Sequence, residues 1–190
     1  MAVAGIFVTI ELEGALAERI HAQQMAVDPK MARHLPPHVT LIGSSGAGPF
    51  HADTSVERLR EAILPIAATT PPMTLRFGPA ERFVDRDIVL LPLDPHGPLR
   101  ALHERLRGCG IEYTPARYPF TPHCTLSLYP TLDAATRRAL LAVREPEPFE
   151  VRALQVYLTR EPQPTRHLFT APLGTAVANG ALARATAAPS

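Results

Sequence analysis

The chain has 190 residues, of which 46% are hydrophobic and 19% charged, a composition typical of a folded protein with one core. Its formal net charge of +1 excludes a polybasic protein that holds a long duplex mainly by counterion release. Two cysteines, Cys109 and Cys124, are too few for a disulfide framework or a zinc ribbon and indicate a reducing compartment. Without a basic, signal-like start or a stretch of roughly 20 apolar residues, the chain is expected to be cytoplasmic.

The first half of the chain predicts strands and helices in alternation. Apolar and polar residues alternate over 6–12, as in a strand, and an apolar stripe at helical spacing follows over 16–27. Pro36 and Pro37 end any helix and lead into a short β-branched segment. Thr54 and Glu57 have the spacing of a capping box, which predicts the start of another helix. The expected elements are strands at 6–12, 38–42 and 73–77, and helices at 16–27 and from 54 onward.

The second half predicts a similar order of elements. Pro98 suits the first turn of a helix and Gly108 suits its end, with a leucine stripe between them. The other expected elements are strands at 87–93, 123–126, 149–159 and 165–173 and a helix at 132–143. From 174 to 190 the chain is mostly Ala, Thr and Gly. This composition predicts a loose, disordered tail after a single domain that spans 1–173.

Two proline-marked segments occupy matching places in these halves. His38 opens the first segment and His123 opens the second, and the separation of 123 − 38 = 85 residues is close to half of the predicted domain. The repeated order of elements predicts the α+β class and a duplicated, bilobal fold. In this fold we expect two antiparallel sheets that face a central cleft, with the helices outside.

Each segment carries the pattern His-x-Thr-Leu, with His38 and Thr40 in the first copy and His123 and Thr125 in the second. Residues i and i+2 of a strand share a face, so each strand presents an imidazole and a hydroxyl together. A single His-x-Thr more often marks a histidine held in the core. Two copies, each directly after a proline and in matching halves, favour a functional site where the two lobes meet.

Paired imidazoles and hydroxyls suit the chemistry of a phosphodiester. One neutral imidazole removes a proton from the attacking oxygen, and a protonated imidazole gives a proton to the leaving oxygen. Threonine hydroxyls donate hydrogen bonds to the non-bridging oxygens as negative charge builds there. We therefore interpret His38 and His123 as catalytic and Thr40 and Thr125 as phosphate-binding, without any cofactor or metal.

The two segments 37–41 and 122–126, their separation and the order of elements resemble the 2H phosphoesterase superfamily. Its members include the RNA 2′,3′-cyclic phosphodiesterases, also called 2′-5′ RNA ligases. The resemblance covers about residues 5–173. It implies a bilobal fold with the two motif strands lining a central cleft, metal-independent chemistry, and substrates with 2′,3′-cyclic phosphates or 2′-5′ linkages. Cys124 occupies the variable position of the second motif.

Three residues before the second motif are further candidates. Arg117 is a candidate to neutralise a phosphate at the mouth of the cleft, although a solvated loop arginine explains it equally well. Tyr118 and Phe120 flank Pro119, and each is a candidate to stack on a nucleobase. For Phe120 the simpler interpretation, packing that holds the loop, is favoured.

Other motifs do not predict a site. The loop 43–48 is rich in glycine and serine but lacks the Gly-Lys-Ser/Thr of a P-loop. His34 and His51 lie near the first motif without the spacing or the carboxylates of a zinc site. Cys124 is interpreted as a small core residue. The remaining histidines are interpreted as surface or helix residues: His21, His96, His103 and His167.

The leading hypothesis is a hydrolase that opens 2′,3′-cyclic phosphate ends of RNA or nucleotides, with the reverse 2′-5′ ligation when two RNA ends are held together. One alternative keeps the chemistry but takes another small substrate, such as a cyclic nucleotide, ADP-ribose cyclic phosphate or a 2′-5′ oligonucleotide. Another is a non-catalytic module that binds RNA ends, against which the intact motifs argue. The expected partners are these RNA ends or nucleotides, with no membrane and no obligate protein partner.

Overall fold

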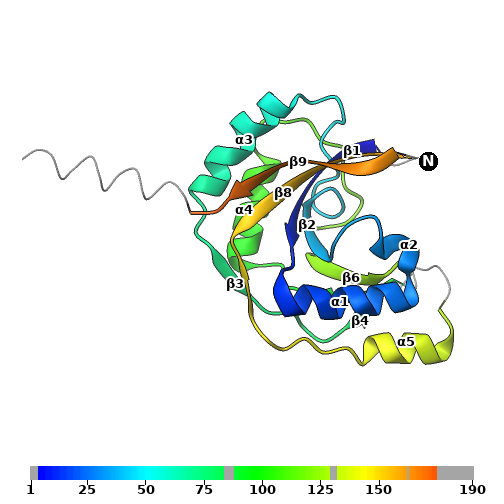
Figure 1. The fold of residues 1–190 in the computed structure, drawn as a ribbon. Coiled ribbons are helices and arrows are strands. Elements are labelled where there is room, and N and C mark those ends of the chain that lie inside the picture. The colour runs from blue at the N-terminus through cyan, green and yellow to red at the C-terminus, as the bar shows by residue number, and fades with distance from the viewer. Residues whose placement is uncertain (1–3, 84–87, 129–131, 162, 175–190) are drawn as a thin grey trace, which may run out of the picture.

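The computed structural model describes residues 4–83, 88–128, 132–161 and 163–174. Within these ranges the chain forms a seven-stranded antiparallel sheet, a two-stranded sheet and five helices (Figure 1). The strands are β1 (Ala4–Glu11), β2 (His38–Ile42), β3 (Met73–Leu75), β4 (Glu81–Arg82), β5 (Val89–Pro92), β6 (His123–Ser127), β7 (Phe149–Val151), β8 (Ala153–Arg160) and β9 (Gln163–Pro172). The helices are α1 (Gly14–Val27), α2 (Pro29–Ala32), α3 (Val56–Ala68), α4 (Gly97–Arg107) and α5 (Ala134–Leu141).

The large sheet has the order β4-β5-β6-β2-β1-β8-β9. Its two motif strands, β2 and β6, are direct neighbours, and the register pairs Val39 with Cys124. The α+β class and the antiparallel strands agree with the sequence prediction. The two sheets that the sequence predicted correspond to the two halves of this one large sheet, which the pairing of β2 with β6 joins edge to edge. A period-two pattern predicts which residues share a face of a strand, but it does not predict which strands become neighbours.

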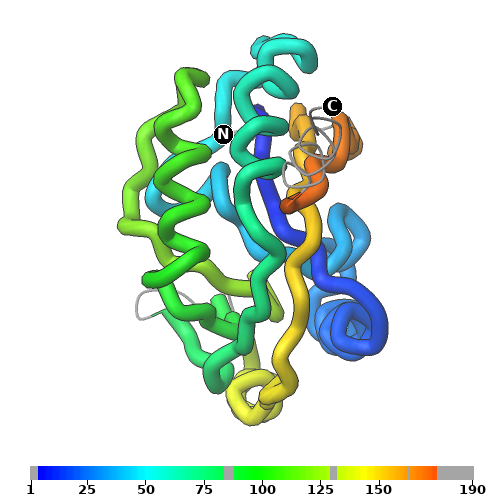
Figure 2. The backbone as a smooth tube through the Cα atoms, turned by 90° about the vertical axis from the view of Figure 1, so that its left-hand side faces the viewer, coloured from blue at the N-terminus to red at the C-terminus, as the bar shows by residue number. Residues whose placement is uncertain are grey.

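The face of the sheet opposite the motif side chains carries the main core. Alternate residues of the central strands are fully buried there, and helices α3 and α4 pack together over them. Figure 2 shows these two helices on one side of the strands and α1 on the other. Helix α1 contacts β6 and covers part of the face that carries the motif histidines. The motif strands are therefore fixed from both sides.

The short-range predictions agree with the structure to within a few residues. Strand β2 has the predicted bounds, and α4 ends at the expected Gly108. Helix α3 begins one residue later than the capping box predicted, because the Ser55 side chain accepts a hydrogen bond from the Arg58 N–H at 3.2 Å. The predicted strand 149–159 is divided into β7 and β8, because β7 pairs with β3 in the small sheet.

Two short elements, α2 and β4, were not predicted, since a few residues carry no periodic pattern. Residues 175–190, for which the sequence predicts a loose tail, lie outside the described residues. No helix in the described ranges is both long and apolar enough to cross a membrane.

Candidate active site

The register of the central strands brings both motifs together on one face. Because Val39 pairs with Cys124 in an antiparallel arrangement, His38 lies opposite Thr125 and Thr40 lies opposite His123. Val39 and Cys124 point into the core on the other face and are fully buried. Directly opposite residues have Cβ atoms roughly 5 Å apart. Two imidazoles and two hydroxyls thus form a compact group, with the two histidines on its diagonal.

The two histidine rings are anchored in the same way. The Nδ1 atom of His38 lies 2.8 Å from the carbonyl oxygen of Pro36, and that of His123 lies 2.7 Å from the carbonyl oxygen of Thr121. A carbonyl oxygen only accepts hydrogen bonds, so each Nδ1 must carry the proton. Each neutral ring therefore has its free lone pair on Nε2, the atom that is available to take or give a proton.

Burial lowers the pKa of both histidines below the ordinary value. For His38 the hydrogen bond to Pro36 and the charge of Glu11 partly oppose this effect. For His123 the hydrogen bond to Thr121 and the charge of Glu81 oppose it, whereas the charge of His38 lowers the pKa further. Both rings are thus held neutral near pH 7 in the free protein, and protonation of one disfavours protonation of the other.

Three neighbours of the histidines carried no motif in the sequence. Glu11 of β1 lies directly opposite His38, and its carboxylate accepts a hydrogen bond from the hydroxyl of Tyr157 on β8. Phe83 packs edge-on against His123, with ring centroids 5.3 Å apart. These contacts join residues far apart in the chain, so only the strand pairing reveals them. The surroundings of the two histidines therefore include one acidic and two aromatic side chains, of which Tyr157 is linked to them through Glu11.

Gln24 of α1 closes the site from the helix side. Its side-chain nitrogen donates a hydrogen bond to the Thr125 carbonyl oxygen at 2.7 Å, and the side chain is buried. Beside it lies a cavity of about 30 Å³, which Gln24, His38 and Thr125 help to line. A volume of this size holds about one water molecule. Helix α1 therefore ties the second motif strand to the surroundings of the first histidine.

The loop before β6 contains the other predicted residues. Arg117 and Tyr118 are exposed, and the guanidinium of Arg117 lies 5.4 Å from the centroid of the Tyr118 ring. Tyr118 is 46% exposed. Its backbone carbonyl accepts a hydrogen bond from the Gly46 N–H at 2.8 Å, which joins the glycine-rich loop to this segment. Both side chains remain accessible to a ligand.

Of the two interpretations of Phe120, the structure favours packing that holds the loop over stacking on a nucleobase. Its ring is only 4% exposed and is stacked on His103, with centroids 4.0 Å apart and planes at 12°. His103 is likewise buried, at 1% exposure, and its Nδ1 donates to the Leu41 carbonyl oxygen at 2.8 Å, so it is not a surface residue. The two rings fill the core between α4, β2 and the loop before β6, and packing against this core excludes Phe120 from ligand contact.

No other described feature competes for this chemistry. A pocket of about 860 Å³ lies at the start of α3 beside Arg160 and Arg166, and none of the motif residues lines it. In the described ranges no group of three or more His, Cys, Asp or Glu side chains is placed to hold a metal ion. The paired imidazoles and hydroxyls of β2 and β6 are therefore the candidate site for acid–base chemistry on a phosphodiester.

The chain thus has an α+β fold with one His-x-Thr pair on each of two neighbouring central strands. The family model of the 2′-5′ RNA ligase superfamily matches residues 12–163, well over half of the chain. The protein belongs to this superfamily, whose members are phosphoesterase and RNA-ligase-like enzymes. The resemblance seen in the sequence is thereby confirmed.

Solved structures with the same fold share a low sequence identity with this chain. E. coli LigT in apo form is 20% identical with a TM-score of 0.56, covering 90% of this chain and 97% of LigT. E. coli LigT complexed with 3′-AMP is 22% identical with a TM-score of 0.55, covering 91% and 99%. TT0787 of Thermus thermophilus is 19% identical with a TM-score of 0.62, covering 92% and 98%. No curated protein sequence matches the chain significantly.

Proposed function

We propose that this protein is a metal-independent phosphodiesterase that hydrolyses 2′,3′-cyclic phosphate ends of RNA or nucleotides. The observation that carries the proposal is the matched pair of imidazoles, His38 and His123, each anchored through Nδ1 to a backbone carbonyl. Both Nε2 atoms belong to one face of the sheet, beside two threonine hydroxyls. A mere binding module would need neither an acid nor a base.

In the proposed reaction, water attacks the phosphorus atom of the cyclic diester. The neutral histidine accepts a proton from this water through Nε2, and the other histidine, protonated on Nε2, donates its proton to the departing ribose oxygen. The P–O bond to that oxygen breaks as the new P–O bond forms, which gives a phosphomonoester and a free hydroxyl. Thr40 and Thr125 donate hydrogen bonds to the non-bridging oxygens. Proton exchange with solvent then restores the starting state of both rings.

The charges around the site favour a diester over a monoester. A cyclic phosphodiester carries one negative charge, whereas a phosphomonoester carries close to two near neutral pH. The described groups around the histidines include neutral hydroxyls, the carboxylate of Glu81, whose charge acts on His123, and the carboxylate of Glu11, which lies opposite His38. This carboxylate repels a dianion more than a monoanion. The arrangement thus suits binding of the substrate and release of the product.

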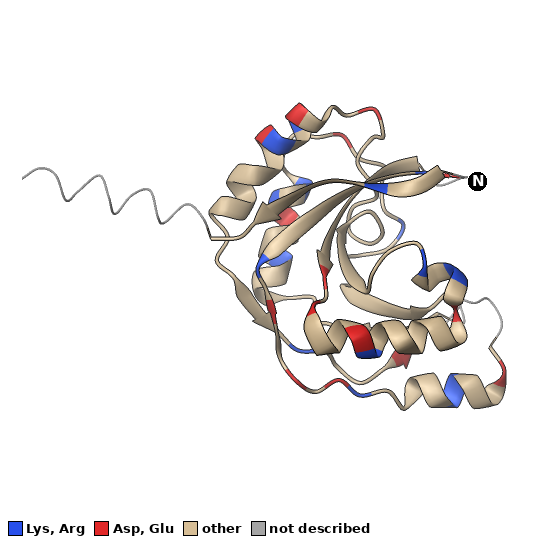
Figure 3. Ribbon diagram, in the orientation of Figure 1, with Lys and Arg blue, Asp and Glu red and all other residues tan. Residues whose placement is uncertain are grey.

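The surroundings of the site support RNA ends or nucleotides as the proposed substrate class. In our proposal Arg117 neutralises a phosphate of the bound strand and Tyr118 stacks on a base, since both are exposed in the loop before β6. Figure 3 shows acidic and basic residues spread over several elements rather than gathered on one, which fits a short RNA end better than a long duplex. LigT, which has the same fold, has been crystallised with the nucleotide 3′-AMP.

Two further aspects belong to the same proposal. By microscopic reversibility the site would also join a 2′,3′-cyclic phosphate to a 5′-hydroxyl, although water at roughly 55 M favours hydrolysis unless both ends are held. We also place the protein in the cytoplasm, where its two free cysteines, Cys109 and Cys124, remain reduced.

The test is a substrate panel measured in the presence of a chelator. A 2′,3′-cyclic nucleotide, an RNA with a cyclic phosphate end and a 2′-5′ dinucleotide are each given to the wild-type protein. We expect turnover of the cyclic substrates that the chelator does not reduce. Activity that requires an added metal would contradict the two-histidine mechanism. Absence of turnover with RNA still bound would support the non-catalytic binding module instead.

A further inference from the structure

The motif residues belong to a row of side chains that continues across the sheet. The register pairs Thr40 with Thr9 of β1, Thr9 with Gln155 of β8, and Gln155 with Thr170 of β9. His123 begins the row on β6, opposite Thr40. Adjacent strands are about 4.8 Å apart, so Gln155 lies about 10 Å from Thr40. This separation is comparable with the length of one nucleoside.

The face of the sheet is closed on one side of the histidines and open on the other. On the β5 side, Leu90 lies opposite Thr125 and is fully buried, and Phe83 packs against His123. On the β8 and β9 side, His167 and Thr170 are exposed. Thr9, which lies between Thr40 and Gln155 in the row, is only 1% exposed. A nucleoside attached to a phosphate at the motif residues would therefore pass over the buried Thr9 toward the exposed residues of β8 and β9 rather than toward β5.

On the open side, the side-chain amide of Gln155 is held in one orientation by its neighbours. The side-chain oxygen of Gln155 accepts hydrogen bonds from Nε2 of His167 at 2.9 Å and from the Thr170 hydroxyl at 2.6 Å. These two donors fix which way the amide points. The NH₂ group of Gln155 makes no hydrogen bond within the described part of the chain. It therefore offers two oriented donors to an acceptor on a ligand.

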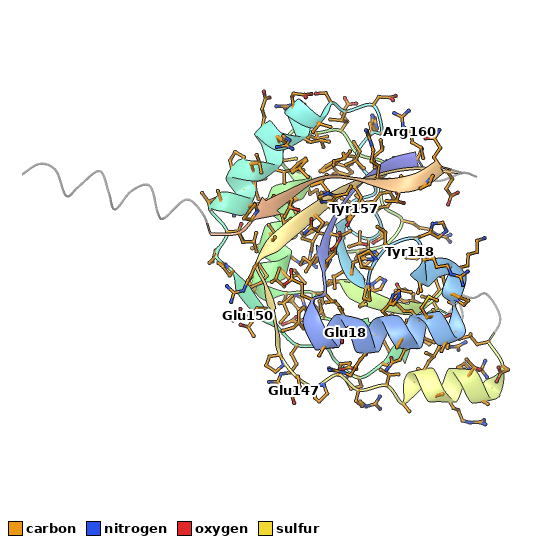
Figure 4. All side chains as sticks on the ribbon, viewed as in Figure 1. Glu18, Tyr118, Glu147, Glu150, Tyr157 and Arg160 are labelled. Atoms are coloured by element: carbon orange, nitrogen blue, oxygen red, sulfur yellow. The ribbon has the colours of Figure 1, made fainter. Side chains whose placement is uncertain are left out.

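Beside this amide, the aromatic rings of Tyr157 and His167 pack edge-on against each other. Their ring centroids are 5.1 Å apart and their planes meet at 62°. The hydroxyl of Tyr157 donates to Glu11, so the tyrosine ring is held in place. Figure 4 labels Tyr157 beside β8, and the strand register places it on the face of the sheet that carries Gln155 and the motif histidines. A ring held in this way, partly exposed, is suited to stacking on a nucleobase.

We propose that this surface, formed by Gln155, Tyr157, His167 and Thr170, binds the base of the nucleotide that carries the cyclic phosphate. The NH₂ of Gln155 donates to an acceptor atom on the base edge, and the base stacks on Tyr157. The inference rests on the proposed function, because the phosphate is placed at the two motifs. It assigns base recognition to β8 and β9, far along the chain from either motif.

The experiment compares a substrate that has a base with one that lacks it. Adenosine 2′,3′-cyclic phosphate and glycerol 1,2-cyclic phosphate contain the same five-membered cyclic diester, and only the first has a base. Gln155→Leu is expected to raise the KM for the adenosine substrate roughly tenfold, the effect of one lost hydrogen bond, with little change in kcat. The kinetics with the glycerol substrate should stay within about twofold of wild type.

A matched control and a second variant make the outcome decisive. Gln163→Leu makes the same chemical change at an exposed position of β9 that lines the pocket near α3, and it should behave as wild type. His167→Ala, which removes one of the two donors to the oxygen of Gln155 and the ring packed against Tyr157, should raise the KM for the adenosine substrate alone. If Gln155→Leu and His167→Ala, folded as judged by thermal unfolding, match wild type on both substrates, the inference is overturned while the proposed function stands. If wild type turns over neither substrate, the proposed function itself fails.

Discussion

Replacing Phe120 with alanine should destabilise the protein severely, whereas the same change at Tyr118, two residues earlier, should not. Phe120 is buried against His103, and the guanidinium of Arg100 lies 5.6 Å from its ring centroid. Tyr118 is 46% exposed. The sequence offers both rings as candidates for base stacking, with packing favoured for Phe120, so this pair of variants tests the structural distinction between them.

The expected magnitudes follow from burial. Truncating a buried phenylalanine to alanine costs about 3–5 kcal/mol, because apolar contacts are lost and a cavity remains. The stacked His103 ring loses its partner as well, which places Phe120→Ala in the upper part of that range. In a domain of this size 1 kcal/mol corresponds to a change in Tm of about 2–4 °C, so Tm should fall by roughly 8–15 °C. An exposed substitution such as Tyr118→Ala should stay within about 0.5 kcal/mol.

Thermal and urea unfolding of the two variants and wild type, followed by circular dichroism, measure these differences without any substrate. Phe120→Ala should lower both Tm and the urea midpoint, and Tyr118→Ala should leave both near the wild-type values. A fall in Tm of less than about 2 °C for Phe120→Ala would refute the reasoning. So would an equally large fall for Tyr118→Ala, since that ring would then be part of the core.

The remaining predictions concern the site. Glu11→Gln should lower the pKa of His38 further, and Glu81→Gln should lower the pKa of His123, because each change removes a negative charge that stabilises the imidazolium. NMR titration of the ring protons measures both pKa values, and unchanged values would contradict this prediction. The profile of kcat/KM against pH should be bell-shaped, and its optimum should lie on the acid side of the ordinary histidine pKa because the pKa values of both His38 and His123 are lowered. As the pH increases, activity first rises because the base loses its proton and then falls because the acid loses its own. The kcat profile should lie at higher pH, because the bound anion raises both values, and coincident profiles would contradict this. Thr40→Val should lower kcat by roughly 10²–10³-fold if its hydroxyl binds the developing charge, and a change confined to KM would place the hydroxyl in ground-state binding instead.

Local patterns were sufficient to predict the motif strands and which of their side chains share a face. The bounds of β2 and the shared face of His38 and Thr40 follow from prolines, β-branched residues and the period of two. The second copy, at His123 and Thr125, follows by the same reasoning. These features lie within a few residues of one another in the sequence, and such features depend least on the rest of the fold.

Contacts between distant segments could not be predicted in this way. The pairing of β2 with β6 decides that the four motif residues form one group, and no local pattern specifies it. Glu11 becomes a neighbour of His38 only because β1 pairs with β2 in that register. The burial of Phe120 likewise depends on His103, seventeen positions earlier on α4. Aromatic residues in a loop look alike in a sequence, and only tertiary packing separates core rings from exposed ones.

The central claim is that the two histidines act as one acid–base unit, and the kcat of the single and double alanine variants tests it most directly. With a 2′,3′-cyclic nucleotide and a chelator, His38→Ala and His123→Ala should each lower kcat by roughly 10²–10⁴-fold. The double variant should lose little more than either single variant, because residues that act as a unit are not additive. His96→Ala, at an exposed histidine, is the control and should retain wild-type activity. Full activity in either single motif variant would contradict the account.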